Sequence, residues 1–392
     1  MDAMLRIGLL LVVGLGSLEG ILVAGEAADP AAGVRFSEVG ISAPRFNPSA
    51  GERVSIHFAL SQAAHVTLHL FDADFELVRT RLDGQALAAG PHTVAWDGRD
   101  GDGAIVPDEA YFFTIEARDR QGRSAVYDPV TFSGGEMYFL DRADFDKEKG
   151  QIRYTLERSG RVSIRMGGHQ GPLLRTFLDW EPRPAGAQVE SWDGTDASGR
   201  IPVRDQPGFV ATIQYFTLPD PAVITHGHRT QSYSQYKAGA RGPRPAQAAR
   251  ARAVKTQRSL SPLFLRPRTA YRTPALQVTF PGVAASSGES PVPMEGTVMI
   301  RVDVPEEDKA RLRDRGMEIY LFLDNRFLME EGRAQLPYQV LFDFSRFPEG
   351  EQVLTVNLLT DDQRVATVSR RVHIRKPAGA APPGQLPGPR PK

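Results

Sequence analysis

The sequence repeats itself at an offset of 96 residues. The segment IHFAL at 56–60 aligns with IRYTL at 152–156, and HVTLHL at 65–70 aligns with RVSIRM at 161–166. Over residues 55–103 the two copies share 15 identities in 49 positions without a gap. A period of about 100 residues is the size of one β-sandwich and is too long for a solenoid repeat. The chain therefore contains a tandem domain duplication.

The repeated segments alternate apolar and polar residues with a period of two, which is typical of half-buried β-strands. The alternation resumes at Tyr111, Phe113 and Ile115, and in the second copy it resumes at Phe209 after a gain of two residues. Turns rich in aspartate and glycine separate these runs. The expected core positions of the first copy are Ile56, Phe58, Leu60, Val66, Leu68 and Leu70.

A third region shows the same alternation. Pro305 followed by Glu306, Glu307 and Asp308 predicts one short helix there, because acidic side chains stabilise the first helical turn. Strands are expected at 297–304, 317–324, 338–344, 352–359 and 364–374.

The fold class that follows is all-β: three Ig-like antiparallel β-sandwich domains joined by a long basic linker. The predicted divisions are a signal peptide at 1–27, the first sandwich at 34–132, the second at 133–224, the basic linker at 225–274, the third sandwich at 275–376 and a Pro-rich disordered tail at 377–392.

The start of the chain resembles an export signal. A charged start ends at Arg6, an apolar run extends from Ile7 to Val23, and small residues follow. This pattern predicts export with cleavage near Ala28, and an uncleaved membrane anchor is the alternative. The sequence has no cysteine, which excludes disulfides and thiolate chemistry. We therefore expect a periplasmic, cell-surface or secreted bacterial protein.

The loop WDGRDGDG at 96–103 spaces three aspartates, Asp97, Asp100 and Asp102, between glycines. Calcium is one interpretation, but neither register places acids and glycine where an EF-hand-type loop needs them. The second copy, WDGTDASG at 192–199, lacks the third acid and keeps the turn glycines. The shared residues favour a turn in which aspartates cap backbone N–H groups and the tryptophan packs beneath. No cofactor is expected.

Histidines offer a second metal hypothesis. If the first two strands pair with each other, His57 and His69 become cross-strand neighbours with His65 nearby, and imidazoles on one face could hold zinc. The second copy has arginine at all three aligned positions. Because arginine does not ligate zinc, a solvated basic face explains both copies.

Residues 226–275 contain eleven of the 47 Lys and Arg residues and no acidic residue, so the remainder of the chain carries a formal charge of about −11. Low hydrophobicity, prolines and charge of one sign predict an extended linker. The candidate binding residues are Arg241, Arg244, Arg250, Arg252, Lys255, Arg258, Arg266, Arg268, Tyr233 and Tyr236.

These side chains suit anions, through ionic contact and stacking. Outside the cytoplasm the available anions are acidic glycans, lipid headgroups and acidic protein surfaces, so no nucleic-acid partner is expected. The acidic remainder of this chain is a further option. The alternative is a solvated linker that only keeps the domains apart.

The segment WDGRDGDGAIVPDEAYFFTIEA at 96–117, with NPSAGERVSIHFAL at 47–60 and HVTLHLFD at 65–72, resembles the Ig-like domain of the flagellar hook-capping protein FlgD. The resemblance covers about 36–224 as a tandem pair. The region at about 275–376 is similar to another bacterial Ig-like type. Both resemblances imply an antiparallel sandwich used as a spacer or binding scaffold, with no catalytic residues to carry over.

The sequence therefore favours a non-catalytic exported scaffold, adhesion or assembly component of the cell envelope that binds protein partners. A glycan-binding accessory protein is the alternative, for which Trp180, Trp192 or Tyr215 would have to form an exposed aromatic platform. A hydrolase is the third possibility and would require a polar cleft with convergent titratable groups. The chain shows neither a nucleophile elbow nor a phosphate-binding glycine loop.

Overall fold

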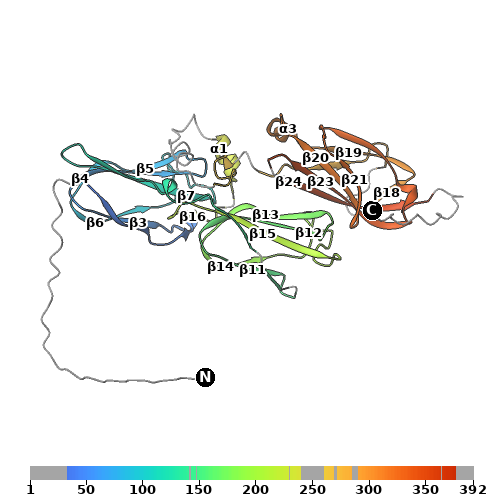
Figure 1. Ribbon diagram of the computed structural model, residues 1–392, viewed down its shortest axis with the longest axis horizontal. Helices are drawn as coiled ribbons and strands as arrows, with labels where there is room; N and C mark the ends of the chain where they lie inside the picture. Colours follow the sequence, from blue (N-terminus) through green and yellow to red (C-terminus); the bar gives the residue numbers. More distant parts are fainter. Residues whose placement is uncertain are drawn as a thin grey trace, which may run out of the picture.

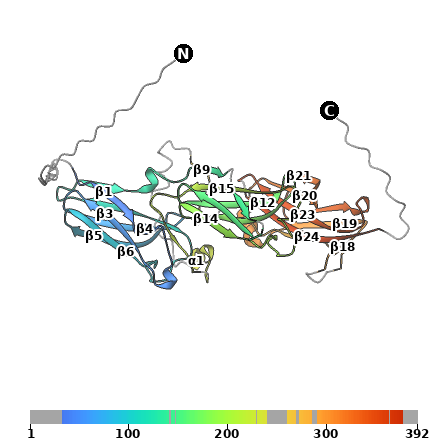
Figure 2. The same ribbon diagram turned by 90° about the horizontal axis from the view of Figure 1, so that it is seen from below.

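The structure is a computed structural model that describes residues 33–140, 143–146, 148–228, 230–239, 260–268, 272–284, 290–362 and 364–376. The predicted signal peptide at 1–27 and the Pro-rich tail at 377–392 lie outside these residues. Three β-sandwiches follow one another in a row (Figures 1 and 2), which confirms the all-β fold class.

The first sandwich consists of a three-stranded and a six-stranded sheet. The smaller sheet has the order β1-β3-β6, with β1 at Phe36–Ile41, β3 at Val54–Leu60 and β6 at Gly90–Trp96. The larger sheet has the order β2-β16-β7-β4-β5 with β8 beside β7; its strands are β2 (Arg45–Phe46), β16 (Val223–Thr225), β7 (Ala110–Arg118), β4 (Ala64–Phe71), β5 (Leu77–Leu87) and β8 (Ser124–Tyr127). All six predicted core positions are at most 3% exposed, so the period-two pattern was interpreted correctly.

The second sandwich repeats this plan with sheets of three and four strands. One sheet has the order β10-β11-β14, with strands at Asp144–Asp146, Gln151–Leu156 and Gly186–Ser191. The other has the order β13-β12-β15-β9, with strands at Leu173–Arg183, Gly160–Gly168, Phe209–Thr217 and Met137–Leu140.

The duplication is visible in the strand pairing itself. The β4–β5 ladder shifts register after Val66, Leu68 and Leu70, and the β12–β13 ladder shifts at the three positions 96 residues later, after Val162, Ile164 and Met166. Leu68 lies opposite Ile115, and Ile164 lies opposite Ile213. These pairs bear out the two-residue gain in the second copy. Register shifts bend a strand at a fixed place, so the two copies share local geometry as well as sequence.

Strand β16 crosses the division predicted at residue 224. It follows the second sandwich in sequence but pairs antiparallel with β7 and parallel with β2, in the first sandwich. Its Val223 is fully buried in the core of the first sandwich. The chain thus returns to its first domain, and the two sandwiches are joined by a strand as well as by their linker.

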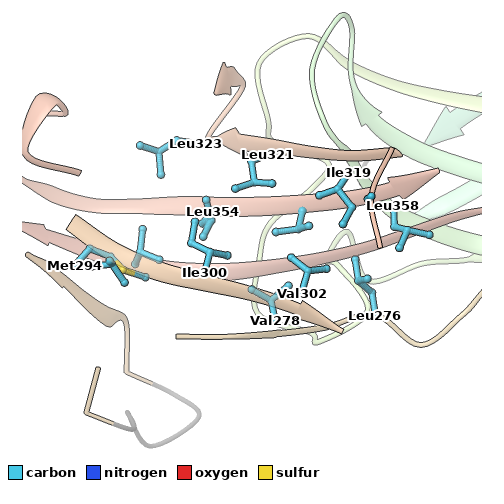
Figure 3. Packing of buried hydrophobic residues seen from close by; sticks show 14 of the residues in the cluster. Leu276, Val278, Met294, Ile300, Val302, Ile319, Leu321, Leu323, Leu354 and Leu358 are labelled. Atoms are coloured by element: carbon cyan, nitrogen blue, oxygen red, sulfur yellow. The ribbon is translucent and has the colours of Figure 1, made fainter. Parts of the chain in front are cut away.

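The third sandwich has sheets in the orders β17-β19-β22 and β18-β24-β23-β20-β21. Figure 3 shows its core, in which Ile300 and Val302 from one sheet pack against Leu321 and Leu354 from the other. Strands β17, β18 and β21 lie outside the segments whose sequence pattern predicts strands. The parallel pair β18–β24 also departs from an antiparallel sandwich. The strands are β17 (Gln277–Thr279), β18 (Val292–Glu295), β19 (Thr297–Asp303), β20 (Met317–Leu323), β21 (Arg326–Glu331), β22 (Tyr338–Asp343), β23 (Gly350–Thr360) and β24 (Val365–Arg375).

Two short helices accompany the sheets. Helix α3 (Glu306–Leu312) has Pro305 at its N-cap and three acids in its first turn, as predicted. Helix α1 (Tyr233–Gly239) lies in the segment predicted to be an extended linker. Within the described part of the chain, neither these nor any other helix has the length and apolar character to cross a membrane.

Candidate functional site

The loop at 96–103 is a turn closed by its own side chains. The indole Nε1–H of Trp96 donates to the carbonyl of Arg99 at 3.0 Å. The Oδ1 of Asp100 accepts the backbone N–H groups of Asp102 and Ala104, each at 3.0 Å, while Asp97 Oδ1 accepts the N–H of Arg99. Trp96 is fully buried beneath the loop. The loop is therefore built on a tryptophan and two aspartates that cap the backbone.

The second copy of the loop uses the same bonds. Trp192 Nε1 donates to the carbonyl of Thr195 at 2.8 Å. The Oδ1 of Asp196 accepts the N–H groups of Ser198, Arg200 and Ile201 at 3.1–3.2 Å. Since the pattern survives without the third acid, the backbone capping explains both copies.

The three aspartates proposed for calcium do not act alike. Asp100 is buried, and its Oδ2 accepts the Tyr236 hydroxyl at 2.9 Å, whereas Asp102 is exposed. Among the described residues, no group of three or more histidine or acidic side chains is placed to hold a metal ion.

We expect calcium to leave the melting temperature of the full chain unchanged, because both carboxylate oxygens of Asp100 already accept hydrogen bonds, one from the loop backbone and one from Tyr236. Asp100→Ala should instead cost about 1–3 kcal/mol, since it leaves buried N–H groups without an acceptor. Calorimetry of the native chain with calcium and with a chelator measures the first effect. Calorimetry of Asp100→Ala beside the native chain measures the second. A melting temperature that rises with calcium in the native chain and not in Asp102→Asn would restore the metal hypothesis.

The histidine hypothesis rested on a strand pairing that does not occur. Strand β3, which carries His57, pairs with β1 and β6, whereas β4, which carries His65 and His69, pairs with β5 and β7. His57 and His69 thus belong to different sheets, and His69 Nδ1 lies 3.0 Å from the hydroxyl of Thr80. Consecutive strands in a sandwich can belong to opposite sheets, and the sequence pattern does not reveal this.

The aromatic residues considered for a glycan platform are all buried. Trp180, Trp192 and Tyr215 are 5%, 4% and 2% exposed. Trp180 packs on Phe216 at the junction of the first two sandwiches, with ring centroids 5.4 Å apart. This corrects the expectation that one of them could stack on a sugar from solvent.

The described part of the basic segment lies against the sandwiches. We call the described residues 230–239, 260–268 and 272–276 the strap. Its helix α1 buries Tyr233 and Tyr236, so neither forms the exposed stacking surface predicted for it. The expectation of an extended chain fails here because a few buried apolar anchors outweigh the polar and charged residues around them. The candidates Arg241, Arg244, Arg250, Arg252, Lys255 and Arg258 lie outside the described residues.

The helix of the strap is bound to the first sandwich by charge. Lys237 Nζ lies 2.9 Å from Asp72, 3.6 Å from Asp74 and 2.5 Å from Glu76. Burial alone would lower the pKa of Lys237, but these carboxylates raise it above its ordinary value. Lys237 is therefore a cation throughout the range in which its partners are ionised.

The second part of the strap contacts all three sandwiches. Leu263 and Phe264 insert between the first two and join a buried cluster with Phe75, Trp180 and Phe216. On the second sandwich, the N–H of Ser261 donates to the Gly135 carbonyl and the N–H of Thr273 donates to Asp179. On the third sandwich, Arg266 lies 3.3 Å from Asp362 and the N–H of Ala275 donates to Asp308.

Arg268 belongs to a buried group of linked ion pairs between the first two sandwiches. Glu109 on the first sandwich is 2% exposed; its Oε1 lies 2.6 Å from Arg161 on β12 and its Oε2 3.3 Å from Arg268. Arg268 also reaches Glu181 on β13 at 3.1 Å. Both sandwiches and the strap thus share one ionic network.

A polar cleft of about 590 Å³ opens beside this network. Its acidic lining is already engaged. Asp108 accepts the backbone N–H groups of Gly227 and His228 at 2.9 and 2.8 Å, Asp179 accepts the N–H of Thr273 at 2.9 Å, and Glu109 holds two arginines. These carboxylates hold segments together, and general acid–base catalysis would need at least one that faces substrate.

The junction residues Glu109, Arg161 and Glu181 were not among the sequence-based candidates. One signal was available: Glu109 stands where the FlgD-type pattern has a glycine, in VPDEAY at 106–111.

Comparisons with known proteins agree with the local sequence motifs. Residues 44–121 match the family model described as FlgD Ig-like domain. No curated protein matches the chain.

Three solved structures illustrate the likeness. The fibronectin(III)-like modules of Clostridium thermocellum CbhA are 10% identical, cover 90% of this chain and 100% of theirs, and give a TM-score of 0.19. A tetra-tandem repeat from the extending region of a large adhesion protein is 11% identical over 87% of this chain and 75% of its own, with a TM-score of 0.19. The FN1–FN3 domains of chicken CNTN1 are 8% identical over 87% and 97%, with a TM-score of 0.17. At these scores they carry no argument about this chain. The family match shows that residues 44–121 are similar to an FlgD Ig-like domain.

Proposed function

We propose that this protein is a non-catalytic exported scaffold of the bacterial cell envelope, in adhesion or assembly, whose Ig-like sandwiches bind protein partners. The observation that carries the proposal is the strap, because one segment contacts all three sandwiches through buried apolar and ionic groups. A chain that secures its domains in this way keeps partner-binding surfaces at fixed separations. An ordinary flexible linker does not.

The direct contact between the second and third sandwiches supports the same role. The side-chain amide of Asn357 on β23 accepts the N–H of Leu173 at 2.9 Å and donates to its carbonyl at 2.7 Å. The hydroxyl of Thr367 on β24 donates to the same carbonyl at 2.7 Å. Both backbone groups of Leu173 are thus satisfied by the neighbouring domain, which fixes the position of one sandwich on the other.

The use of charge in the strap bears on how partners bind. Lys237, Arg266 and Arg268 are all paired with acids of this chain. The excess of positive charge in the segment is therefore matched, at these residues, by the excess of acids elsewhere. Partners therefore bind at the surfaces of the sandwiches, where edge strands and loops are the usual docking elements of such domains.

Export follows from the N-terminal pattern, in which a charged start precedes an apolar run and small residues. Fractionation of cells tests it together with partner binding. We expect the full chain in the envelope or medium, cross-linked to a reproducible set of envelope proteins. Recovery from the cytoplasm alone, or no cross-linked partner beyond those of an unrelated exported Ig-like protein, contradicts the proposal.

The strap itself gives a separate prediction. Lys237→Met keeps the aliphatic length and removes the charge that three carboxylates share, so α1 should open more often. We expect backbone amides of residues 233–239 to exchange hydrogen at least about tenfold faster, measured by mass spectrometry. The control is Lys309→Met, which removes a lysine from the surface pair with Glu306 on α3. Equal exchange of 233–239 in the native chain and Lys237→Met would show that the strap is not held by this charge.

A further inference from the structure

A second cavity lies between the second and third sandwiches and has the opposite charge to the acidic remainder of the molecule. Its volume is about 470 Å³, within the range of small-molecule sites. It lies between the loop after Trp192 and strands β17, β18 and β24. Among the described residues, its lining contains three arginines and no acidic side chain: Ser198, Arg200, Ile201, Val278, Thr279, Phe280, Val283, Ala284, Ser290, Val292, Ser369, Arg370 and Arg371.

The duplicated loop shows how this charge arose. Ser198 and Arg200 occupy the positions of Asp102 and Ala104 in the first copy. In both copies the preceding buried aspartate accepts the backbone N–H groups at these two positions, so the backbone is the same and only the side chains differ. One copy of the loop presents an acid and an alanine, and the other presents a hydroxyl and a guanidinium to the cavity.

Two of the three arginines of the cavity, Arg200 and Arg370, differ from those of the strap. Within the described part of the chain, neither Arg200 nor Arg370 forms an ion pair, although Arg266 and Arg268 of the strap both do. Arg370 donates one N–H to the carbonyl of Ser369 at 3.2 Å. A guanidinium has five N–H donors in a plane, so most of its capacity is available for a planar oxyanion such as a carboxylate.

The remaining lining indicates what the oxyanion is attached to. Val278, Phe280, Val283 and Val292 contribute apolar surface to the lining of the cavity, and Phe280 is only partly buried. Thr279 adds a hydroxyl to the lining. A sugar ring combines an apolar C–H face with hydroxyl groups, and a uronic acid adds the carboxylate. Free phosphate would engage the arginines and leave the apolar lining unused.

We propose that this cavity binds a uronate residue of an acidic glycan. Arg200 and Arg370 hold the carboxylate, the apolar lining packs against the ring, and the Thr279 hydroxyl pairs with a hydroxyl of the sugar. This site goes beyond the scaffold function, since it gives the chain a carbohydrate ligand in addition to its protein partners. It also places glycan recognition away from the buried Trp180, Trp192 and Tyr215.

Calorimetric titration of the full chain with an oligogalacturonate at low ionic strength tests the proposal. The fully methyl-esterified oligosaccharide is the matched neutral ligand. We expect the acid to bind and the ester to bind at least about tenfold more weakly, because the charge-assisted bonds are lost. Arg200→Gln and Arg370→Gln should each weaken the acid about tenfold. Arg346→Gln, at an arginine 79% exposed and paired with Asp343, should not.

Three results would overturn the proposal. The first is that the acid does not bind, or binds no better than its ester. The second is that inorganic phosphate binds as tightly as the oligosaccharide, which would make this a site for simple anions. The third is that both arginine variants bind the acid as tightly as the native chain does. Melting temperatures of the variants, compared with Arg346→Gln, exclude unfolding as the cause of any loss. Because Arg200 is exposed, its replacement leaves the core intact.

Discussion

Replacing Arg161 with methionine is expected to lower the free energy of unfolding by about 3 kcal/mol, because it leaves the buried side chain of Glu109 with one partner fewer. The side chains of Arg161 and Glu109 are 4% and 2% exposed, and their closest atoms are 2.6 Å apart. Arg268 still lies 3.3 Å from Glu109, which places the loss at the lower end for a broken buried pair. Urea unfolding followed by tryptophan fluorescence measures it.

The matched control is Arg153→Met in the same sandwich. Arg153 pairs with Asp144 and Asp146 but is 38% exposed, so its loss should cost at most about 1 kcal/mol. The double variant Glu109→Gln with Arg161→Met should recover part of the loss, since it also removes the buried acid that lost its partner. Equal costs for Arg161→Met and Arg153→Met would mean that the buried pair does not join the two sandwiches as described.

The largest expected effect on a single sandwich comes from Trp96→Ala, at about 3–5 kcal/mol. Trp96 is fully buried and packs edge-on against Phe46 and Tyr111, with ring centroids 5.6 and 5.3 Å away. The substitution removes this packing, creates a cavity and leaves the carbonyl of Arg99 without its indole donor. Differential scanning calorimetry should show the first sandwich melting at a lower temperature.

Two further variants separate packing from hydrogen bonding. Trp96→Phe keeps a buried aromatic ring, gives up part of the ring volume and loses the indole N–H, so it should cost about 1–3 kcal/mol. Trp192→Ala should lower the melting temperature of the second sandwich in the way that Trp96→Ala lowers that of the first, because Trp192 makes the equivalent hydrogen bond to Thr195. A Trp96→Ala loss below about 1 kcal/mol would show that the tryptophan loop does not support its sandwich.

The ionic network explains a property of the sequence that composition alone conceals. The whole chain is neutral, yet eleven of its 47 basic residues lie in one segment that contains no acid, so the remainder carries an excess of acids. Lys237 meets Asp72 and Glu76 across more than 160 positions of sequence, and Arg268 meets Glu109 across 159. The charge asymmetry is therefore a long-range pairing within one molecule at these residues. The sequence offered this only as one option among several anionic partners.

The predictions that succeeded concern local patterns. The alternation of Ile56, Phe58 and Leu60 predicts which side chains face the core, because a strand has a period of two wherever it lies. The short helix after Pro305 follows from its acidic first turn. The tryptophan loop was recognisable as a turn because the second copy shows which residues are dispensable. In each case the cause and the effect lie within a few residues of each other.

The sequence by itself thus determined the all-β class, the duplicated sandwich and the turn at each WDG motif, since these depend on short-range periodicity and backbone capping. Only the tertiary structure decided that β16 returns to the first sandwich, that Tyr233 and Tyr236 are buried, and that three arginines meet at one cavity. These features join residues far apart in the chain. Their positions depend on how whole sheets and domains pack, and no local pattern records that packing.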